Sequence, residues 1–391
     1  MTVRVSKPKF NLREKLSELD KPTGVKGNDL MRSDTSQEAR DLISAGRKNK
    51  IINGAMLIDQ RHNGSSHTSS NNYHTDRFRT QTAGMDQLNQ SYQRVSDGPD
   101  GFPRSLKITT NTAESDVASS GEYISLYQKI EGQNLQDLAY GTISAKPVTV
   151  SFYVKSSITG TFGYTVYRND TTDRAINKTY TINNANTWER KNITLEGDTV
   201  QTIENSRNDN WWNVWHLGAS TGYMSAPASA WANYTGANWA GFHNQNGVIT
   251  TQGATWQITG IQMEIGENAT EFEHRSYGEE LALCQRYYQM IDGTSDLTPF
   301  GFGRANGTQI IEAAVPLTVP LRATPTITCS HNTAWGHANA NTSTSTPTIG
   351  RWTKYATVLH VTFGGHSGMT NGRVANVHCG SSSNFIMDAE L

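Results

Sequence analysis

Alternation of apolar and polar side chains is the strongest pattern in this chain, and it constrains the fold to one rich in β-strands. In the stretch VTVSFYVK every second residue is apolar and shares one phase: Val148, Val150, Phe152 and Val154. Side chains of a strand point alternately to its two faces, so this spacing predicts a strand with one buried face.

Several more short strands are predicted between polar turns. They are SLKITT, YISLYQKI, GTFGYTVY, TYTIN, RKNITL, NVWHLG and WQITGIQMEIG. Many short strands at roughly even spacing favour a β-sandwich or jelly roll, here over residues 48–275. In the last segment the apolar residues before Gly260 and those after it fall on opposite faces of a regular strand, which predicts a β-bulge at Gly260.

The first 47 residues read differently, because they are charged and nearly free of aromatic residues. Two short helices are predicted there, one in NLREKLSELDK and one in DTSQEARDLISAG. Helices of this length are not stable alone in water. Residues 1–47 are therefore expected to fold back on the neighbouring domain or to dock on another chain, and the small apolar content favours docking.

A connecting helix is predicted over residues 276–291. It opens with Ser276 and Glu279 at capping-box spacing, and its apolar stripe includes Cys284, which we interpret as a packed residue and not a nucleophile. Residues 292–391 are predicted to form a second β domain. Its strands are TQIIEAAVPLTV, TPTITCS, YATVLHVTFGG and NFIMDAEL, and a polar loop spans residues 330–350.

The overall charge excludes some classes of partner. The net charge is −1, which provides no electrostatic argument for nucleic acid, and no stretch of 18 apolar residues predicts membrane insertion. The opening residues lack the apolar core of a secretory signal, so synthesis in a cytoplasm is expected. Three cysteines without a regular spacing do not predict a disulfide framework.

Several quoted strings together resemble a group of tailed-bacteriophage virion proteins, described as tail fibres or receptor-binding proteins. These strings are GRKNKIINGAMLIDQR, ISAKPVTVSFYVKSSITGTF, TWERKNITLEGD, ITGIQMEIGENATEFEHRSYGEELALCQRYY and the final DAEL. The resemblance covers about residues 47–291 well and the remainder less well. It implies a jelly roll similar to carbohydrate-binding modules.

The resemblance also implies partners and a location. It implies a homotrimer in the phage tail, with residues 1–47 attached to other virion proteins and residues 292–391 directed toward the host. The expected function is recognition of host cell-surface polysaccharide without catalysis, after assembly in the host cytoplasm. The alternative is a collar, adaptor or head-fibre subunit, in which the sandwich mediates protein–protein assembly.

No catalytic motif is present, so no catalytic residue and no cofactor are predicted. Acidic residues at 86, 97, 100, 114 and 116 lie in turn-rich segments, which leaves a polysaccharide-cleaving pair as a weaker alternative. Cys329, Cys379 and the nearby histidines lack zinc-ligand spacing, and we predict no metal site. The first strand of the jelly roll also lacks the carboxylate with which related modules bind structural calcium.

Aromatic residues on polar loops are the remaining candidates for function, because their rings can stack on sugars. Six residues are predicted as glycan contacts: Trp212, Trp231, Trp239, Trp335, Trp352 and Tyr355. For Trp231 the alternative is that its ring closes the end of the sandwich.

The densest aromatic segment is NDNWWNVWHL. Alternation places Trp211, Trp215 and Leu217 on one face of a strand and Trp212 on the other. The three rings therefore cannot form one platform. We assign Trp215 and Leu217 to the core and Trp212 to the binding face.

Overall fold

The computed structural model of the protein describes residues 47–115, 117, 121–293, 298–329, 335–336, 340–341, 348–351, 357–364, 370–379 and 383–391. Met1–Lys48 and Asn49–Leu391 are separate units, and the description that follows concerns the second. The two helices expected before residue 47 lie outside the described residues.

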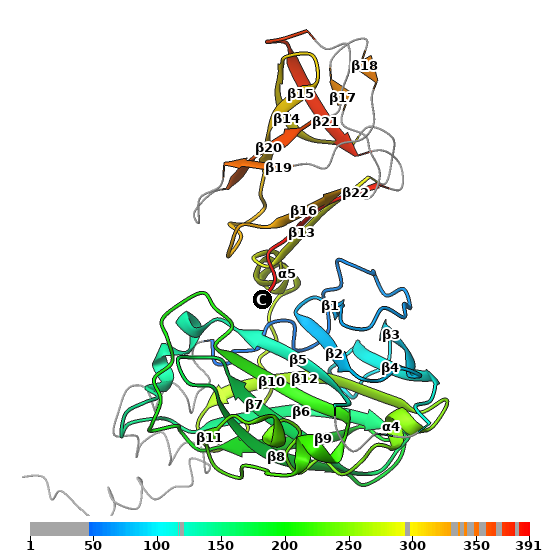
Figure 1. The fold of residues 1–391 in the computed structure, drawn as a ribbon, viewed down its shortest axis with the longest axis vertical. Helices are drawn as coiled ribbons and strands as arrows, with labels where there is room; N and C mark the ends of the chain where they lie inside the picture. The colour runs from blue at the N-terminus through cyan, green and yellow to red at the C-terminus, as the bar shows by residue number, and fades with distance from the viewer. Residues whose placement is uncertain are drawn as a thin grey trace, which may run out of the picture. The chain divides into compact units, whose positions relative to one another are not determined.

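Two antiparallel sheets form a β-sandwich (Figure 1), which confirms the predicted jelly roll in a mainly β protein. The larger sheet has the order β1 (Tyr73–Thr75), β2 (Phe78–Ala83), β5 (Tyr123–Ile130), β10 (Trp211–Ala219), β7 (Gly160–Arg168), β8 (Arg174–Ile182) and β11 (Ala232–Asn233). The smaller sheet has the order β3 (Asn89–Val95), β4 (Ser105–Thr112), β12 (Thr255–Ile265), β6 (Val148–Ser156) and β9 (Glu189–Leu195).

Apolar residues from both sheets fill the space between them. From β6 the predicted set is fully buried: Val148, Val150, Phe152 and Val154. From the larger sheet Trp215 packs edge-on against Phe152, with ring centroids 5.8 Å apart. Burial of this apolar surface is the main source of stability for the sandwich.

The predicted bulge at Gly260 is confirmed. The register of β12 against β6 shifts between Thr259 and Gln262, and Gly260 has φ = +61°. A Cβ at this position would lie 2.9 Å from the rings of Phe102 and Tyr153, so glycine is required by space as well as by conformation.

The helix predicted over residues 276–291 is too long. Helix α5 covers Tyr277–Gln285, and the capping box of Ser276 and Glu279 is present. Residues 288–293 instead form strand β13 (Tyr288–Gly293), which pairs with β22 (Ser383–Asp388). The other helical segments among the described residues are short: η1 (Gly132–Leu138), η2 (Thr221–Met224), η3 (Gly236–Asn238) and α4 (Gly247–Thr250).

Two further antiparallel sheets follow α5. The three-stranded sheet has the order β13, β22 and β16 (Thr326–Cys329). The other has the order β18 (Ala340–Asn341), β17 (Trp335–Gly336), β21 (Val374–Cys379), β14 (Thr298–Asn306), β15 (Ile310–Pro316), β20 (Val358–Phe363) and β19 (Thr348–Arg351). They share a second apolar core, which includes Phe300, Val361 and Phe385. Most of the polar loop predicted over residues 330–350 lies outside the described residues.

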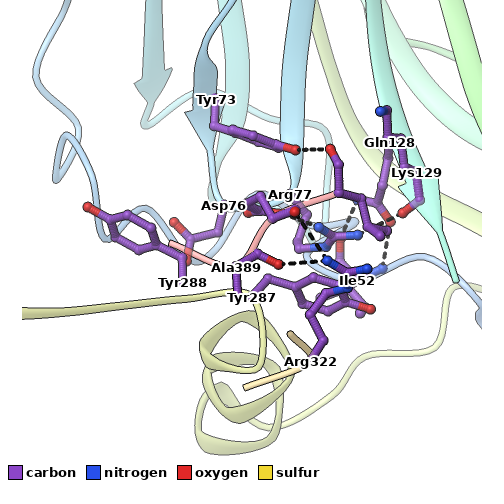
Figure 2. Close-up of polar contacts among 12 residues, drawn as sticks. Ile52, Tyr73, Asp76, Arg77, Gln128, Lys129, Tyr287, Tyr288, Arg322 and Ala389 are labelled. Carbon is purple, nitrogen blue, oxygen red and sulfur yellow. Dashed lines mark hydrogen bonds and ion pairs between the residues drawn. The ribbon is translucent and has the colours of Figure 1, made fainter. Parts of the chain in front are cut away.

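The residues after β22 lie beside Arg77, a buried arginine of the sandwich (Figure 2). Arg77 pairs through Nη1 with the carboxylate of Glu390, and its Nη2 donates to the carbonyl oxygen of Lys129 at 2.7 Å. The guanidinium of Arg77 also lies 3.4 Å from the ring centroid of Tyr287. Arg77 and Glu390 are therefore a buried ion pair with well-placed additional partners.

Backbone groups of the same segment are held as well. The Tyr73 hydroxyl donates to the carbonyl oxygen of Leu391 at 3.0 Å, and Arg322 donates to that of Ala389 at 3.1 Å (Figure 2). Arg61 contacts the second carboxylate oxygen of Glu390 at 3.3 Å. Residues 388–391 are thus joined to the sandwich by charge pairs and by main-chain hydrogen bonds.

Candidate functional site

The tryptophan run in β10 divides its rings between the two faces of the sheet, as alternation predicts. Trp211, Trp215 and Leu217 are fully buried in the main core. Trp212 is partly exposed and packs instead against a second, smaller cluster on the outer face of the larger sheet. The assignment of Trp215 and Leu217 to the core is therefore confirmed.

Trp212 belongs to a continuous group of aromatic side chains on this outer face. We call it the aromatic surface, and it consists of Tyr123, Tyr127, Tyr167, Trp212, Tyr223, Tyr234 and Trp239. Strands β5, β7 and β10 supply four of these rings, and the segment between β10 and β12 supplies the other three. The strand residues meet because they lie at alternate positions on neighbouring strands: Trp212 is paired with Tyr167, and Val214 with Tyr127.

Ring contacts run from one end of the aromatic surface to the other. Trp212 stacks on Tyr127 at 5.2 Å and meets Tyr167 edge-on at 5.2 Å. Tyr167 contacts Tyr234 at 4.9 Å. At the other end Tyr123 contacts Tyr223 at 5.1 Å. Contacts at these distances and angles fix the rings relative to one another.

Trp239 lies at the centre of the aromatic surface but is only 5% exposed, which corrects its expected role as an exposed loop ring. The segment that carries it folds back onto the sheet. The Thr165 hydroxyl donates to the carbonyl oxygen of Trp239 at 2.9 Å, and the Asn177 amide donates to that of Asn238 at 2.9 Å. Trp239 therefore supports Tyr123, Tyr167 and Trp212 from behind.

Trp231 lies apart from the aromatic surface, and its position agrees with the alternative reading. Its ring packs against Trp211 and Tyr140, both at 5.8 Å, and it contacts the main core. Its indole donates to the carbonyl oxygen of Glu196 at 2.7 Å. The carbonyl oxygen of Trp231 accepts from Arg174, which pairs with buried Asp198. Trp231 therefore covers the end of the sandwich core.

Charged groups border the exposed ring of Trp212. Lys129 Nζ lies 3.8 Å from the ring centroid and donates to Asp209 at 2.7 Å. Burial lowers the pKa of Lys129, although its bond to Asp209 acts in the opposite direction. Because Lys129 covers part of Trp212, a ligand that stacks there has to pack beside the ammonium group or move it toward Asp209.

Three tyrosines of the aromatic surface, Tyr123, Tyr127 and Tyr167, keep their protons at neutral pH. Burial raises the pKa of Tyr123 and of Tyr127 to about 12, and it raises that of Tyr167 further with the help of a hydrogen bond to Asp173. Their hydroxyls are hydrogen-bond donors and acceptors and not anions. The surface thus combines apolar ring faces with neutral polar groups.

Two buried histidines lie beneath the aromatic surface. His216 is hydrogen-bonded to Ser125 at 2.8 Å and to Thr165 at 3.0 Å, and its ring contacts that of Trp239. His243 Nδ1 accepts from the backbone N–H of Gly163 at 3.1 Å. Burial lowers the pKa of His216 well below its usual value and that of His243 to about 4. Both rings are therefore neutral in the folded protein at neutral pH.

We expect the free energy of unfolding to fall as the pH drops from about 6.5 toward 4. The unfolded chain protonates His216 and His243 near pH 6.5, whereas the folded protein keeps them neutral, so acid favours the unfolded state. For His243 the slope approaches about 1.4 kcal/mol per pH unit between its unfolded and folded pKa values, and His216 acts in the same direction. Asp76 acts in the opposite direction, because burial raises its pKa to about 6.

Urea unfolding at pH 7, 6 and 5 measures this dependence for the wild type and for His243→Gln. The difference between the two isolates His243, because Asp76 is common to both. The variant should show a shallower pH dependence, and replacing His274, whose side chain is exposed, with glutamine is the control for the loss of one imidazole. Equal slopes for the wild type and His243→Gln would contradict the assignment.

Several other predicted features can be placed. Cys284 is buried, and burial raises the pKa of its thiol well above the usual value, which confirms that it is packed. Trp335 begins strand β17, and its side chain is not described. Trp352 and Tyr355 lie outside the described residues.

Within the described ranges no group of three acidic, histidine or cysteine side chains could hold a metal ion. No helix in these ranges is long and apolar enough to cross a membrane.

A second aromatic cluster lines a small pocket of about 210 Å³ on the outer face of the smaller sheet. Phe102, Tyr153 and Phe272 form its apolar walls, with ring contacts of 5.0–5.2 Å. Arg190 and Glu271 also line it. The pocket is large enough for one small ligand, and it lies on the opposite sheet from the aromatic surface.

Comparisons with known proteins give no family for this chain. No family model and no curated protein match it. Similar solved structures include the enzymatically active domain of tailspike protein 4 of bacteriophage CBA120, with 13% identity and a TM-score of 0.30 over 56% of this chain. The match covers only 21% of that tailspike domain.

Carbohydrate-binding modules are also among the similar structures. One is described as CBM4, with 14% identity and a TM-score of 0.28 over 55% of this chain and 99% of the module. Another is the family 11 module of the cellulase Lic26A-Cel5E of Clostridium thermocellum, with 10% identity and a TM-score of 0.27 over 53% and 99%. TM-scores of 0.30 and below do not establish a shared function.

Five tyrosines of the aromatic surface were not predicted as candidates from the sequence. For three of them a signal exists: Tyr123 and Tyr127 alternate with Ile124 and Leu126 in YISLYQKI, and Tyr167 alternates with Val166. Residues out of phase with the core must lie on the outer face. Tyr223 and Tyr234 have no such periodic signal, because they lie between strands.

Proposed function

We propose that the protein is a non-catalytic glycan-binding component of a bacteriophage virion, built as a homotrimeric tail fibre. Residues 1–47 attach it to other tail proteins, residues 48–275 bind glycan, and residues 292–391 face the host cell. The observation that carries the glycan-binding part is the aromatic surface, in which Trp212 and four tyrosines are partly exposed beside Lys129 and Asp209.

This surface has the chemistry that sugar recognition requires. Faces of a pyranose ring are apolar and pack on aromatic rings, while hydroxyl groups need hydrogen-bond partners at the edge. Here the rings are held by mutual contacts, so little side-chain entropy is lost when a ligand binds. Several weak sites on one trimer would gain affinity through multivalency.

Four exposed apolar residues on one face of a C-terminal sheet support self-association. Phe302 is 62% exposed and Val374 is 68% exposed, and Ile310 and Val358 are exposed too. The pairing of β14 with β15 and β21, and of β15 with β20, places all four on the same face of one sheet. The same face also carries the ion pair of Arg304 and Glu312, and a mixture of apolar and charged residues is common in protein–protein contacts.

Replacing Trp212 with alanine is expected to weaken binding of host surface polysaccharide at least about tenfold, which corresponds to about 1.4 kcal/mol. The reason is loss of the exposed ring, which has no role in the main core. Binding of purified polysaccharide fragments to the wild-type full chain and to the variant, measured by calorimetry, tests this. Trp212→Phe should retain part of the affinity.

Tyr277 provides a matched control, because it is an exposed aromatic residue at the start of α5. Tyr277→Ala should bind as the wild type does. If Trp212→Ala keeps full affinity while Phe272→Ala loses it, the glycan site is the small pocket on the other sheet.

Absence of glycan binding by the wild type would favour the collar, adaptor or head-fibre alternative. A monomer of 43.1 kDa in sedimentation would contradict the trimer.

A further inference from the structure

A large polar pocket is lined by residues that do not belong to the aromatic surface. Its volume is about 800 Å³, and its lining consists of Gln133, Asn205, Ser206, Arg207, Asn208, Arg286, Pro320, Arg322 and Ala323. No acidic or aromatic side chain is part of this lining. Three arginines and several amides therefore face one space.

Arg207 and Arg322 are positioned by each other. Each donates through a terminal nitrogen to the backbone carbonyl oxygen of the other. Arg322 is held further by the carbonyl oxygen of Ala389 at 3.1 Å. Main-chain acceptors hold these guanidinium groups in place without neutralising their charge.

The third arginine shares a single buried carboxylate with Arg322. Arg286 donates to Glu131 at 3.0 and 3.2 Å, and Arg322 Nε lies 3.9 Å from the same carboxylate. Tyr287 and Gln133 also donate to Glu131, at 2.7 and 2.6 Å. Among the residues that the structure describes, no other carboxylate lies within ion-pair distance of these arginines, so the positive charge at the pocket exceeds the negative.

Burial makes this excess charge unfavourable in the absence of a counter-ion. It lowers the pKa of Arg322, and the attraction of Glu131 does not offset it. The Nε atom of Arg322 is buried without a hydrogen-bond acceptor. Buried charges are normally paired, so an anion from outside the chain would relieve the cost.

We propose that this pocket binds an anionic group, phosphate or carboxylate, carried by a saccharide. Guanidinium groups match the geometry of both anions, and amide side chains such as Gln133 and Asn205 can bond sugar hydroxyls. The volume accommodates a sugar with its charged substituent. The proposal does not depend on glycan binding at the aromatic surface, because the two sites share no residue.

Calorimetric titration of the full chain with glucose 6-phosphate, glucuronate and neutral glucose tests the proposal and separates its two anions. Binding of one or both charged sugars at least about tenfold more tightly than glucose is the expected result. Arg207→Gln is expected to weaken binding of the charged sugar at least tenfold. Asn208→Asp is a second variant, which places a negative charge at the pocket without removing a side-chain hydrogen bond.

Arg104→Gln is the control for the loss of one positive charge, because Arg104 lies on the β3–β4 connection, outside the pocket. It and Trp212→Ala should bind charged sugars as the wild type does. Failure of both charged sugars to bind, equal binding of neutral glucose, or unchanged affinity in both Arg207→Gln and Asn208→Asp overturns the proposal. If only Trp212→Ala loses polysaccharide binding, that result concerns glycan binding at the aromatic surface and not anion binding in the pocket.

Discussion

Replacing Glu390 with alanine is expected to lower the free energy of unfolding by about 3–5 kcal/mol. Glu390 is the carboxylate partner of Arg77, which is almost fully buried in the sandwich. Burial acts to lower the pKa of Arg77, but Glu390 raises it above its usual value. Without Glu390 the Arg77 guanidinium stays in a dry site with only the carbonyl oxygen of Lys129 and the ring of Tyr287 as partners.

Urea unfolding followed by tryptophan fluorescence measures the loss. A double variant, Arg77→Met with Glu390→Leu, should recover most of the stability, because it removes both charges together and fills similar volume. Arg61 keeps Asp76 and Asp388 as partners in that variant. Exposed Glu267→Ala is the matched single-carboxylate control and should be neutral. A Glu390→Ala protein as stable as the Glu267→Ala protein would show that the buried pair is absent.

Replacing Trp215 with alanine is expected to destabilise the sandwich by about 3–5 kcal/mol. The Trp215 ring is fully buried and contacts Phe152 and Tyr164 at 5.8 and 5.3 Å, so its removal leaves a cavity between the two sheets. Trp212→Ala on the same strand removes a ring of equal size from the partly exposed face. It should destabilise much less.

The pair of variants separates stability from binding. Thermal unfolding should show a large shift for Trp215→Ala, and polysaccharide titration should show a large loss for Trp212→Ala. The opposite pattern, with a stable Trp215→Ala protein and normal binding by Trp212→Ala, is incompatible with the observed faces of β10.

Sequence periodicity predicted the strands that border the main core. β6 alternates along its whole length, and β12 alternates in two phases that meet at the Gly260 bulge, because one face of each packs against apolar residues of the core. The sequence pattern did not predict β2 and β3, which have the sequences FRTQTA and NQSYQRV. They lie toward the edges of the two sheets and bury few apolar side chains. Their strand conformation therefore depends mainly on backbone hydrogen bonds to β5 and β4, which leave no apolar pattern in the sequence.

The overlong helix has a similar explanation. Tyr288 and Ile291 continue the helical spacing of Cys284, so periodicity alone extends α5. In the structure both residues belong to β13, and Tyr288 pairs with Asp388, a hundred residues later in the chain. Pairing over such a distance leaves no local signal in the sequence.

The candidate site was predictable where it lies on strands and not where it lies on loops. Alternation identified Trp212 as the outward ring of its run. The burial of Trp239 depends on hydrogen bonds from Thr165 and Asn177 that fold a long connection onto the sheet. Composition of that connection, rich in glycine, asparagine and alanine, indicates a loop but not the surface on which it lies.

The position of β22 has a consequence for biosynthesis. It is the central strand of its sheet, between β13 and β16, yet it is the last of the three to leave the ribosome. Until residues 383–388 emerge, both neighbours lack the strand with which they pair. Unpaired strand edges invite association with other chains, and several copies are translated close together on one message. While β22 is still inside the ribosome, the nascent chain therefore exposes strand edges that can mispair and that can also meet sister chains.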